Sequence, residues 1–107
     1  MTKYEMEHNI YTIRHYGPVV AAAGINPERL DALTIFGLAG AISADDEVER
    51  LCRAVPDPPM LRRDKLDAEF DLPARIDFYK LTLQVLQKMN PGSRELLAAR
   101  VLRRSGL

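Results

Sequence analysis

The first segment of the chain carries a stripe of aromatic side chains that repeats every three or four positions. The stripe consists of Tyr4, His8, Tyr11 and His15. On a helix, this spacing places the four rings along one side. Tyrosine suits a protein interface, because its ring buries a large area while its hydroxyl keeps a hydrogen bond. The stripe therefore predicts a partner-binding face with Tyr4, Tyr11 and His15, and the alternative is that these rings border the domain's own core.

A second candidate face lies near the end of the chain. Arg100, Arg103 and Arg104 share one side of a predicted helix. Such a cluster suits phosphate groups or an acidic protein partner. Alternatively, basic residues in a last turn complement the negative end of the helix dipole. The sequence leaves both interpretations open.

The sequence contains no recognisable metal or cofactor pattern. His8 and His15 lie seven positions apart, whereas helical metal ligands lie one turn apart, and no clustered cysteine joins them. The acidic stretch 44–49 lacks the alternating ligands and central glycine of a calcium loop. The two glycines of 36–43 lack the frame of a dinucleotide-binding turn. We expect neither a metal ion nor a cofactor.

The candidate nucleophiles have no base beside them in the sequence pattern. Ser43, Ser93 and Ser105 lie at predicted helix caps or in the tail. Cys52 lies on an apolar helical stripe, where a buried thiol is usually unreactive. Nucleophilic catalysis needs a base within hydrogen-bond reach. We therefore expect a protein that is not an enzyme, and the alternative is an accessory subunit whose site is completed by a larger chain.

Residues 18–36 have the spacing of a helix-turn-helix, with a glycine at the turn and apolar anchors after it. A recognition helix must present basic, amide or hydroxyl side chains to base edges. The exposed candidates here are Glu28, Arg29 and Asp31, and two acids repel phosphate. This favours a plain corner between packed helices, with a nucleic-acid-binding regulator as the alternative.

The length of 107 residues fits one helical domain over 1–107. Fifteen basic and fifteen acidic side chains give no net charge, which removes the overall attraction that nonspecific nucleic-acid binders need. The charge is nevertheless uneven: residues 1–50 carry four basic and eight acidic side chains, and residues 51–107 carry eleven and seven. Opposite charges can complement each other within the fold or across a homodimer.

The single cysteine and the absence of a signal-peptide pattern predict a cytoplasmic protein. The longest apolar run, 32–42, falls short of the roughly 20 residues that a membrane helix requires. We therefore expect no membrane association. We also expect this run to be packed on all sides in the core.

The apolar periodicity predicts an all-α fold, a small orthogonal bundle of about five helices. In the first segment, Met6, Ile10 and Ile13 favour a helix, although the β-branched and aromatic residues around them leave a strand as the alternative. Gly17 and Pro18 should end this element, and a short helix should then run from Pro18 to a stop at Gly24.

Later boundaries are predicted from capping residues and prolines. Asn26 should cap the next helix, and Ser43 should begin another. The prolines of 55–60 predict a stiff corner, followed by a short helix or turn with Leu66 and Phe70 facing inward. Two further helices are expected: a central core helix over 73–89 with one polar arc, and a last helix over 93–104.

These patterns predict a small non-enzymatic protein–protein interaction module: an adaptor, chaperone or inhibitor that occupies a partner's surface, as a monomer or a homodimer. The predicted partner-binding residues are Tyr4, Tyr11, His15, Arg100, Arg103 and Arg104. The alternatives are a helix-turn-helix regulator using 18–36 and an accessory subunit of a larger enzyme.

Overall fold

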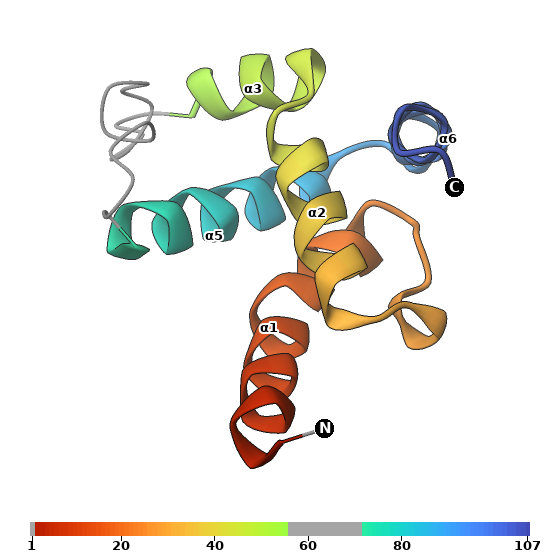
Figure 1. The fold of residues 1–107 in the computed structure, drawn as a ribbon. Helices are drawn as coiled ribbons and strands as arrows, with labels where there is room; N and C mark the ends of the chain where they lie inside the picture. Colours follow the sequence, from red (N-terminus) through yellow and green to blue (C-terminus); the bar gives the residue numbers. More distant parts are fainter. Residues whose placement is uncertain (1, 56–71) are drawn as a thin grey trace.

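The computed structural model describes residues 2–55 and 72–107, with side chains from Phe78 onward in the second range. The elements are α1 (Lys3–Ala22), the short 3-10 helix η1 (Pro27–Arg29), α2 (Ala32–Ser43), α3 (Asp46–Arg53), α5 (Leu72–Lys88) and α6 (Pro91–Arg104) (Figure 1). This part of the chain contains no strand, so the predicted all-α bundle is confirmed. The predictions for 56–60 and for the segment around Leu66 and Phe70 lie outside the described residues. No described helix has the length and apolar character needed to span a bilayer.

The first segment is one continuous helix, and the predicted end at Gly17 and Pro18 is wrong. Thr2 caps α1 by accepting a hydrogen bond from the Glu5 N–H, and the helix passes through Pro18 to Ala22. Proline removes one backbone donor from the helix. Burial of Val19 and Val20 in the core compensates for that loss and keeps the next turn helical.

α1 ends where Gly24 was expected to stop a helix. Gly24 has a φ of 91°, and the Ile25 N–H donates to the Val20 carbonyl at 3.2 Å, which is the pattern of a glycine C-terminal cap. The expected helix after Asn26 is wrong, because Asn26 caps only η1. α2 begins later, with Asp31 as its cap: the carboxylate accepts from the Thr34 N–H at 2.7 Å.

Ser43 is the last residue of α2 and does not begin α3. Its hydroxyl donates to the Ala39 carbonyl at 2.9 Å, so it is committed to the helix that it ends. Asp45 caps α3 instead, because its carboxylate accepts from the N–H groups of Glu47 and Val48. The N-cap of α3 therefore lies two residues later in the chain than the sequence pattern predicted.

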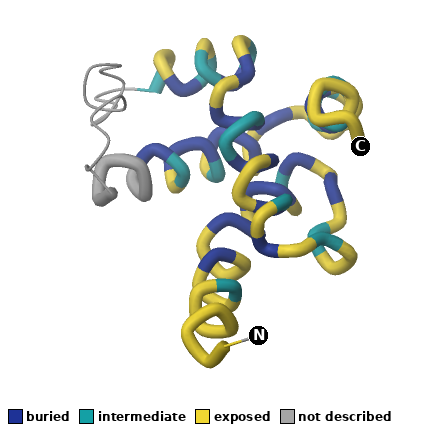
Figure 2. Tube along the Cα trace, in the orientation of Figure 1, coloured by how far each residue is buried: buried dark blue, intermediate teal, exposed yellow. Residues whose placement is uncertain are grey.

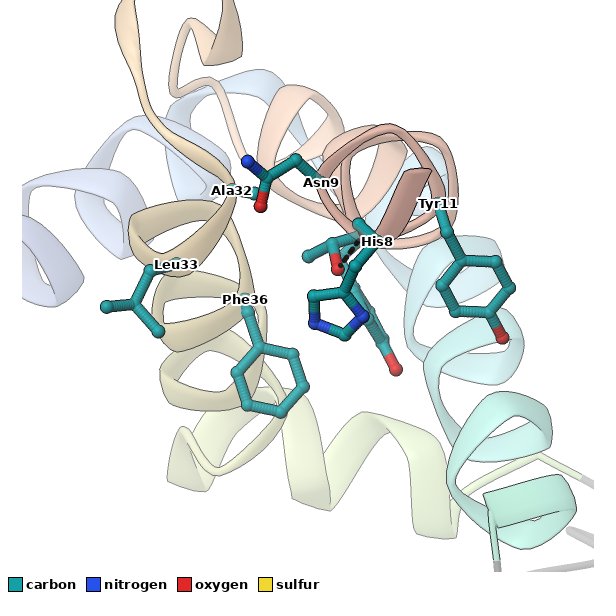
Figure 3. A pocket seen from close by; sticks show the side chains of 8 residues that line it. His8, Asn9, Tyr11, Ala32, Leu33 and Phe36 are labelled. Carbon is teal, nitrogen blue, oxygen red and sulfur yellow. Dashed lines mark hydrogen bonds between the residues drawn. The ribbon is translucent and has the colours of Figure 1, made fainter. Parts of the chain in front are cut away.

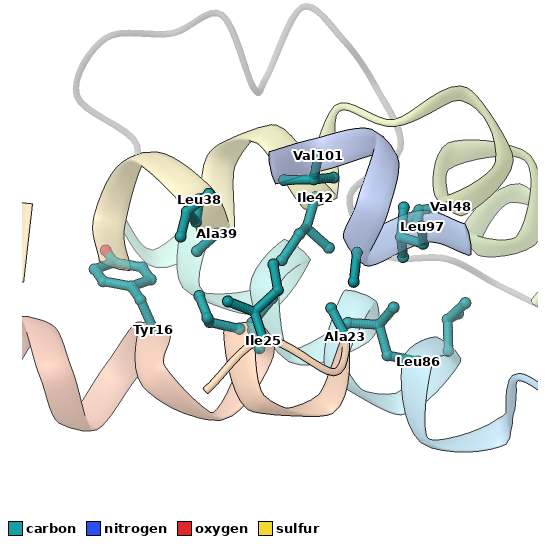
Figure 4. Close-up of a cluster of buried hydrophobic side chains, with 14 of the residues drawn as sticks. Tyr16, Ala23, Ile25, Leu38, Ala39, Ile42, Val48, Leu86, Leu97 and Val101 are labelled. Carbon is teal, nitrogen blue, oxygen red and sulfur yellow. The ribbon is translucent and has the colours of Figure 1, made fainter. Parts of the chain in front are cut away.

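The core joins the five α-helices of residues 2–55 and 72–107 (Figure 4). α5 contributes Leu81, Val85 and Leu86, and the described residues of its polar arc, Lys80, Gln84, Gln87 and Lys88, are exposed as expected. α6 is also oriented as predicted. Its buried residues are Leu97, Ala98 and Val101.

The apolar run 32–42 is buried on one side only, so the expectation that it is packed on all sides is wrong. Ile35, Leu38 and Ile42 are buried between α1, α5 and α6. Leu33 is 80% exposed and Phe36 is 42% exposed. No described helix covers this second side of α2, which remains available as surface.

Candidate protein-binding site

The first half of α1 extends away from the body of the protein. Figure 2 shows this part of the helix almost entirely exposed. The buried residues of α1 begin at Thr12, so its first two turns make little contact with the core. We call the exposed side chains of residues 4–13 on α1 and 33–36 on α2 the α1–α2 surface.

Large apolar side chains are concentrated on the α1–α2 surface. They are Tyr4, Met6, Ile10, Tyr11, Ile13, Leu33 and Phe36. Met6, Ile10 and Ile13 share one side of α1, and Tyr4 and Tyr11 lie on another. Among the described residues, only Leu96 and Leu107 are large, apolar and exposed elsewhere. Single exposed apolar residues are ordinary, but a concentration of them marks an interaction surface.

A cleft of about 490 Å³ lies between α1 and the start of α2 (Figure 3). Its lining comprises His8, Asn9, Tyr11, Thr12, Tyr16, Ala32, Leu33 and Phe36. In Figure 3, the imidazole of His8 and the ring of Phe36 both project into the space between the two helices. The cleft thus combines apolar walls with a few polar groups on the α1 side, as is typical of ligand and peptide sites.

The wall of the cleft is held by aromatic packing. The ring of Tyr16 meets the rings of Phe36 and Tyr79 edge to face, with centroids 5.2 and 4.9 Å apart. This cluster connects α1, α2 and α5. The Thr12 hydroxyl donates to the His8 carbonyl at 3.0 Å, so it is satisfied within α1. Phe36 is therefore a supported side chain that is still partly open to solvent.

The three aromatic residues predicted from the first segment all lie on α1. Tyr4 is 76% exposed and stacks on His8 with ring centroids 6.3 Å apart. Tyr11 meets His15 edge to face at 4.3 Å and lines the cleft. His15 is exposed on the same side of the helix. Tyr4 and Tyr11 therefore lie outside the core, and their role in binding stays a prediction.

The three C-terminal arginines do not join this surface. Figure 1 places α6 away from the first half of α1. The Arg100 guanidinium is engaged internally: Nε and Nη2 donate to Asp45 at 2.7 and 2.9 Å. Arg103 and Arg104 are exposed, and Nη1 of Arg104 lies 3.8 Å from Asp45 Oδ2. Arg100 thus connects α6 to the start of α3, a contact the sequence did not indicate.

Asp45 is the only buried charged residue in the described part of the chain. Its side chain is only 1% exposed. Burial raises the pKa of Asp45, but hydrogen bonds from Arg100 and from the Glu47 N–H outweigh that effect and hold it below its ordinary value. The same bonds raise the pKa of Arg100. This pair is structural in character, because both groups are satisfied by each other.

The other residues that could act as a nucleophile or as metal ligands are either buried or far apart. Cys52 is buried, and burial raises the pKa of its thiol, which keeps it protonated and unreactive. Within 2–55 and 72–107, no three His, Cys, Asp or Glu side chains come together in a way that could hold a metal ion. The α1–α2 surface, with its apolar cleft, is thus the best candidate for a binding site among the described residues.

The alternative helix-turn-helix over 18–36 places its second helix directly after Asn26. In the structure, Glu28 and Arg29 lie on η1 instead, and the following α-helix is α2. Its sequence, ALTIFGLAGAIS, contains no Lys, Arg, Asn or Gln. Leu33, Phe36 and Gly37 form its exposed side. These residues offer neither hydrogen bonds to base edges nor attraction to phosphate, but they suit contact with an apolar protein surface.

Leu33 and Phe36 were not predicted as surface residues, because both fall within an apolar run that is typical of a core helix. A usable signal was present: a helix apolar on every side has more apolar circumference than a few neighbours can cover.

Comparisons of the chain with protein-family models, curated proteins and solved structures find no match. The residues around the cleft therefore carry the functional inference.

Proposed function

We propose that this chain is a non-enzymatic protein-interaction module that binds a partner protein through the α1–α2 surface. The supporting observation is the apolar cleft of about 490 Å³ between α1 and α2, which is lined by the exposed side chains of Tyr11, Leu33 and Phe36. Leaving such a surface in water is unfavourable, at about 25 cal/mol per Å² of apolar area, and a partner that covers it recovers that free energy. An adaptor, a chaperone or an inhibitor would use such a surface in this way.

The shape of the cleft favours an amphipathic helix as the bound segment. Two helices that diverge around an apolar cleft accept a third helix, whose apolar side chains enter at a spacing of three or four residues. Leu33 and Phe36 would contact these side chains, while His8 offers a polar group at the edge. Residues 1–50 carry an excess of acidic side chains, so basic residues flanking the apolar face of the partner would add attraction.

The direct test is site-specific photocrosslinking in the source cells. A photoreactive phenylalanine analogue at Phe36 should form adducts with a defined partner protein. The same analogue at Leu96, an exposed residue on α6, is the matched control and should not capture that protein. Equal capture at both positions, or no adduct at Phe36, would contradict the proposal.

The captured partner then permits a quantitative test with purified proteins. Leu33→Asp places a charge in an apolar contact and should weaken binding roughly tenfold or more, the effect of losing one well-buried anchor. Leu96→Asp makes the same change at a residue that is 69% exposed on α6 and should leave the affinity unchanged. Both residues are exposed, so neither change should unfold the protein. Equal affinities for the two variants would remove Leu33 from the site.

A further inference from the structure

A second exposed stripe runs along the side of α1 that faces away from the core. Its members follow alternating steps of three and four positions: Tyr4, Glu7, Tyr11, Arg14, Pro18 and Ala21. All six are exposed, whereas the buried residues of α1 lie on the opposite side of the helix. A three–four repeat is the pattern by which one helix packs along another. The stripe runs from Tyr4 to Ala21, nearly the whole of α1, and is about 27 Å long at 1.5 Å per residue.

The charges of the stripe are arranged symmetrically about its middle. Glu7 lies one turn before Ile10 and Tyr11, and Arg14 lies one turn after them. Together with His15, these residues line a shallow depression of about 420 Å³ on the outer side of α1. The stripe therefore has an apolar centre with one acid and one base at equal distances from it.

We propose that two copies of this chain associate by packing their α1 helices antiparallel along this stripe, with a two-fold axis at Ile10 and Tyr11. In that arrangement, Glu7 of each copy comes within reach of Arg14 of the other. The symmetry gives two such ion pairs around the apolar contacts of Ile10 and Tyr11. A parallel pair would place like charges together, so the charge pattern selects the antiparallel arrangement.

The stripe fits a second copy better than an unrelated protein, because it is complementary to itself. An isologous interface requires that residue i contacts residue j and that j contacts i, and Glu7 and Arg14 meet this requirement. The stripe shares Tyr4 and Tyr11 with the α1–α2 surface, but Leu33 and Phe36 lie on α2, outside the stripe. Variants at Glu7 and at Leu33 therefore test the dimer and the partner complex separately. The self-association goes beyond the proposed function.

The experiment is a charge exchange read out by sedimentation equilibrium. Glu7→Arg faces Arg14 of the second copy, and Arg14→Glu faces Glu7, so each single variant should dimerise at least about tenfold more weakly than the wild type. The double variant E7R/R14E restores opposite charges and should dimerise like the wild type. A mixture of the two single variants should form a heterodimer, because each now supplies the charge that the other lacks.

Other results would overturn the antiparallel arrangement. They are a wild type that stays monomeric at all concentrations, single variants that dimerise normally, or a mixture that fails to pair. Circular dichroism of each variant checks that the exposed substitutions leave the helices folded. Leu33→Asp should remain dimeric, and E7R should keep the Phe36 crosslink, so failure of the dimer is distinguishable from failure of the proposed function.

Discussion

At the scale of single residues, the carboxylate of Asp45 stabilises two helices, α3 and α6. It caps α3 through the Glu47 and Val48 N–H groups, and it receives two hydrogen bonds from Arg100 on α6. Its side chain is buried, so losing these partners would leave a charge with little access to water. The orientation of α6 against the start of α3 therefore depends on a single ionised group.

We expect Asp45→Asn to lower the free energy of unfolding at neutral pH by about 1.5–3 kcal/mol, the contribution of hydrogen bonds to a charged group. Asparagine keeps an oxygen that can cap α3, so the change isolates the interaction with Arg100. The pKa of Asp45 is lowered in the folded protein, so its contribution is present above the unfolded pKa of about 3.9. It is lost as the pH falls through the folded pKa.

Urea denaturation from neutral to acidic pH measures this effect, and the difference between wild type and Asp45→Asn should shrink towards zero on acidification. Asp46→Asn is the matched control, because Asp46 is exposed in the same first turn of α3. Its cost should stay within about 0.5 kcal/mol, as for an ordinary surface change. A difference for Asp45→Asn that is independent of pH would show that its charge is unimportant.

The Arg100–Asp45 pair also shows why site residues are harder to predict than helices. The two residues are 55 positions apart, and no local pattern relates them. Helical spacing correctly grouped Arg100, Arg103 and Arg104, but it could not show that Arg100 has a buried acid opposite it. Periodicity gives the side of a helix on which a residue lies, whereas its partner depends on how the helices pack.

At the scale of the elements, helix interiors were more predictable than helix ends. The helices predicted over 73–89 and 93–104 correspond to α5 and α6, because their apolar periodicity is regular. The boundaries near Pro18, Asn26 and Ser43 were wrong, because each of these residues is compatible with more than one local structure. A helix can continue through a proline when the turn that follows is buried. A capping residue can precede a single turn as well as a long helix.

Alanine substitutions at Gly24, which ends α1, and at Gly37, inside α2, test whether α1 needs a left-handed residue at its end. Gly24→Ala should lower the free energy of unfolding by about 1–2 kcal/mol, because alanine is strained at a φ of 91°. A Cβ there would lie 4.0 Å from the Cβ of Ala98, an ordinary contact, so the cost is conformational. Gly37→Ala, inside α2 with open space around the new methyl group, should raise it by about 0.5–1 kcal/mol.

Urea denaturation at one protein concentration compares these two alanine variants directly. The fixed concentration matters, because self-association would add to the apparent stability. The opposite signs are the informative result. If both alanines stabilise the protein, the left-handed conformation of Gly24 is not required to end α1.

At the scale of the whole molecule, composition predicted a folded domain and apolar periodicity predicted helices, but neither predicted which apolar residues would stay outside the core. The chain has enough apolar residues to build a core from five helices. It also has an excess of them in α1 and α2, and the exposed Ile10 and Leu33 show that excess. Whether an apolar residue lies inside or outside depends on how many neighbours the fold supplies, which local sequence does not encode.

The division of α1 into an outer and a packed half should be visible in amide hydrogen exchange. In monomeric E7R, amides of residues 5–11 should exchange faster than those of 19–22, because the first two turns lack the core contacts of the later ones. In the wild type, exchange of 5–11 should slow as the protein concentration rises, since the second copy covers the same turns. Mass spectrometry of peptides from each half measures both effects. Uniform protection along α1 in the monomeric variant would mean that the outer half is held by contacts within the chain, and exchange that is independent of concentration would argue against pairing through this helix.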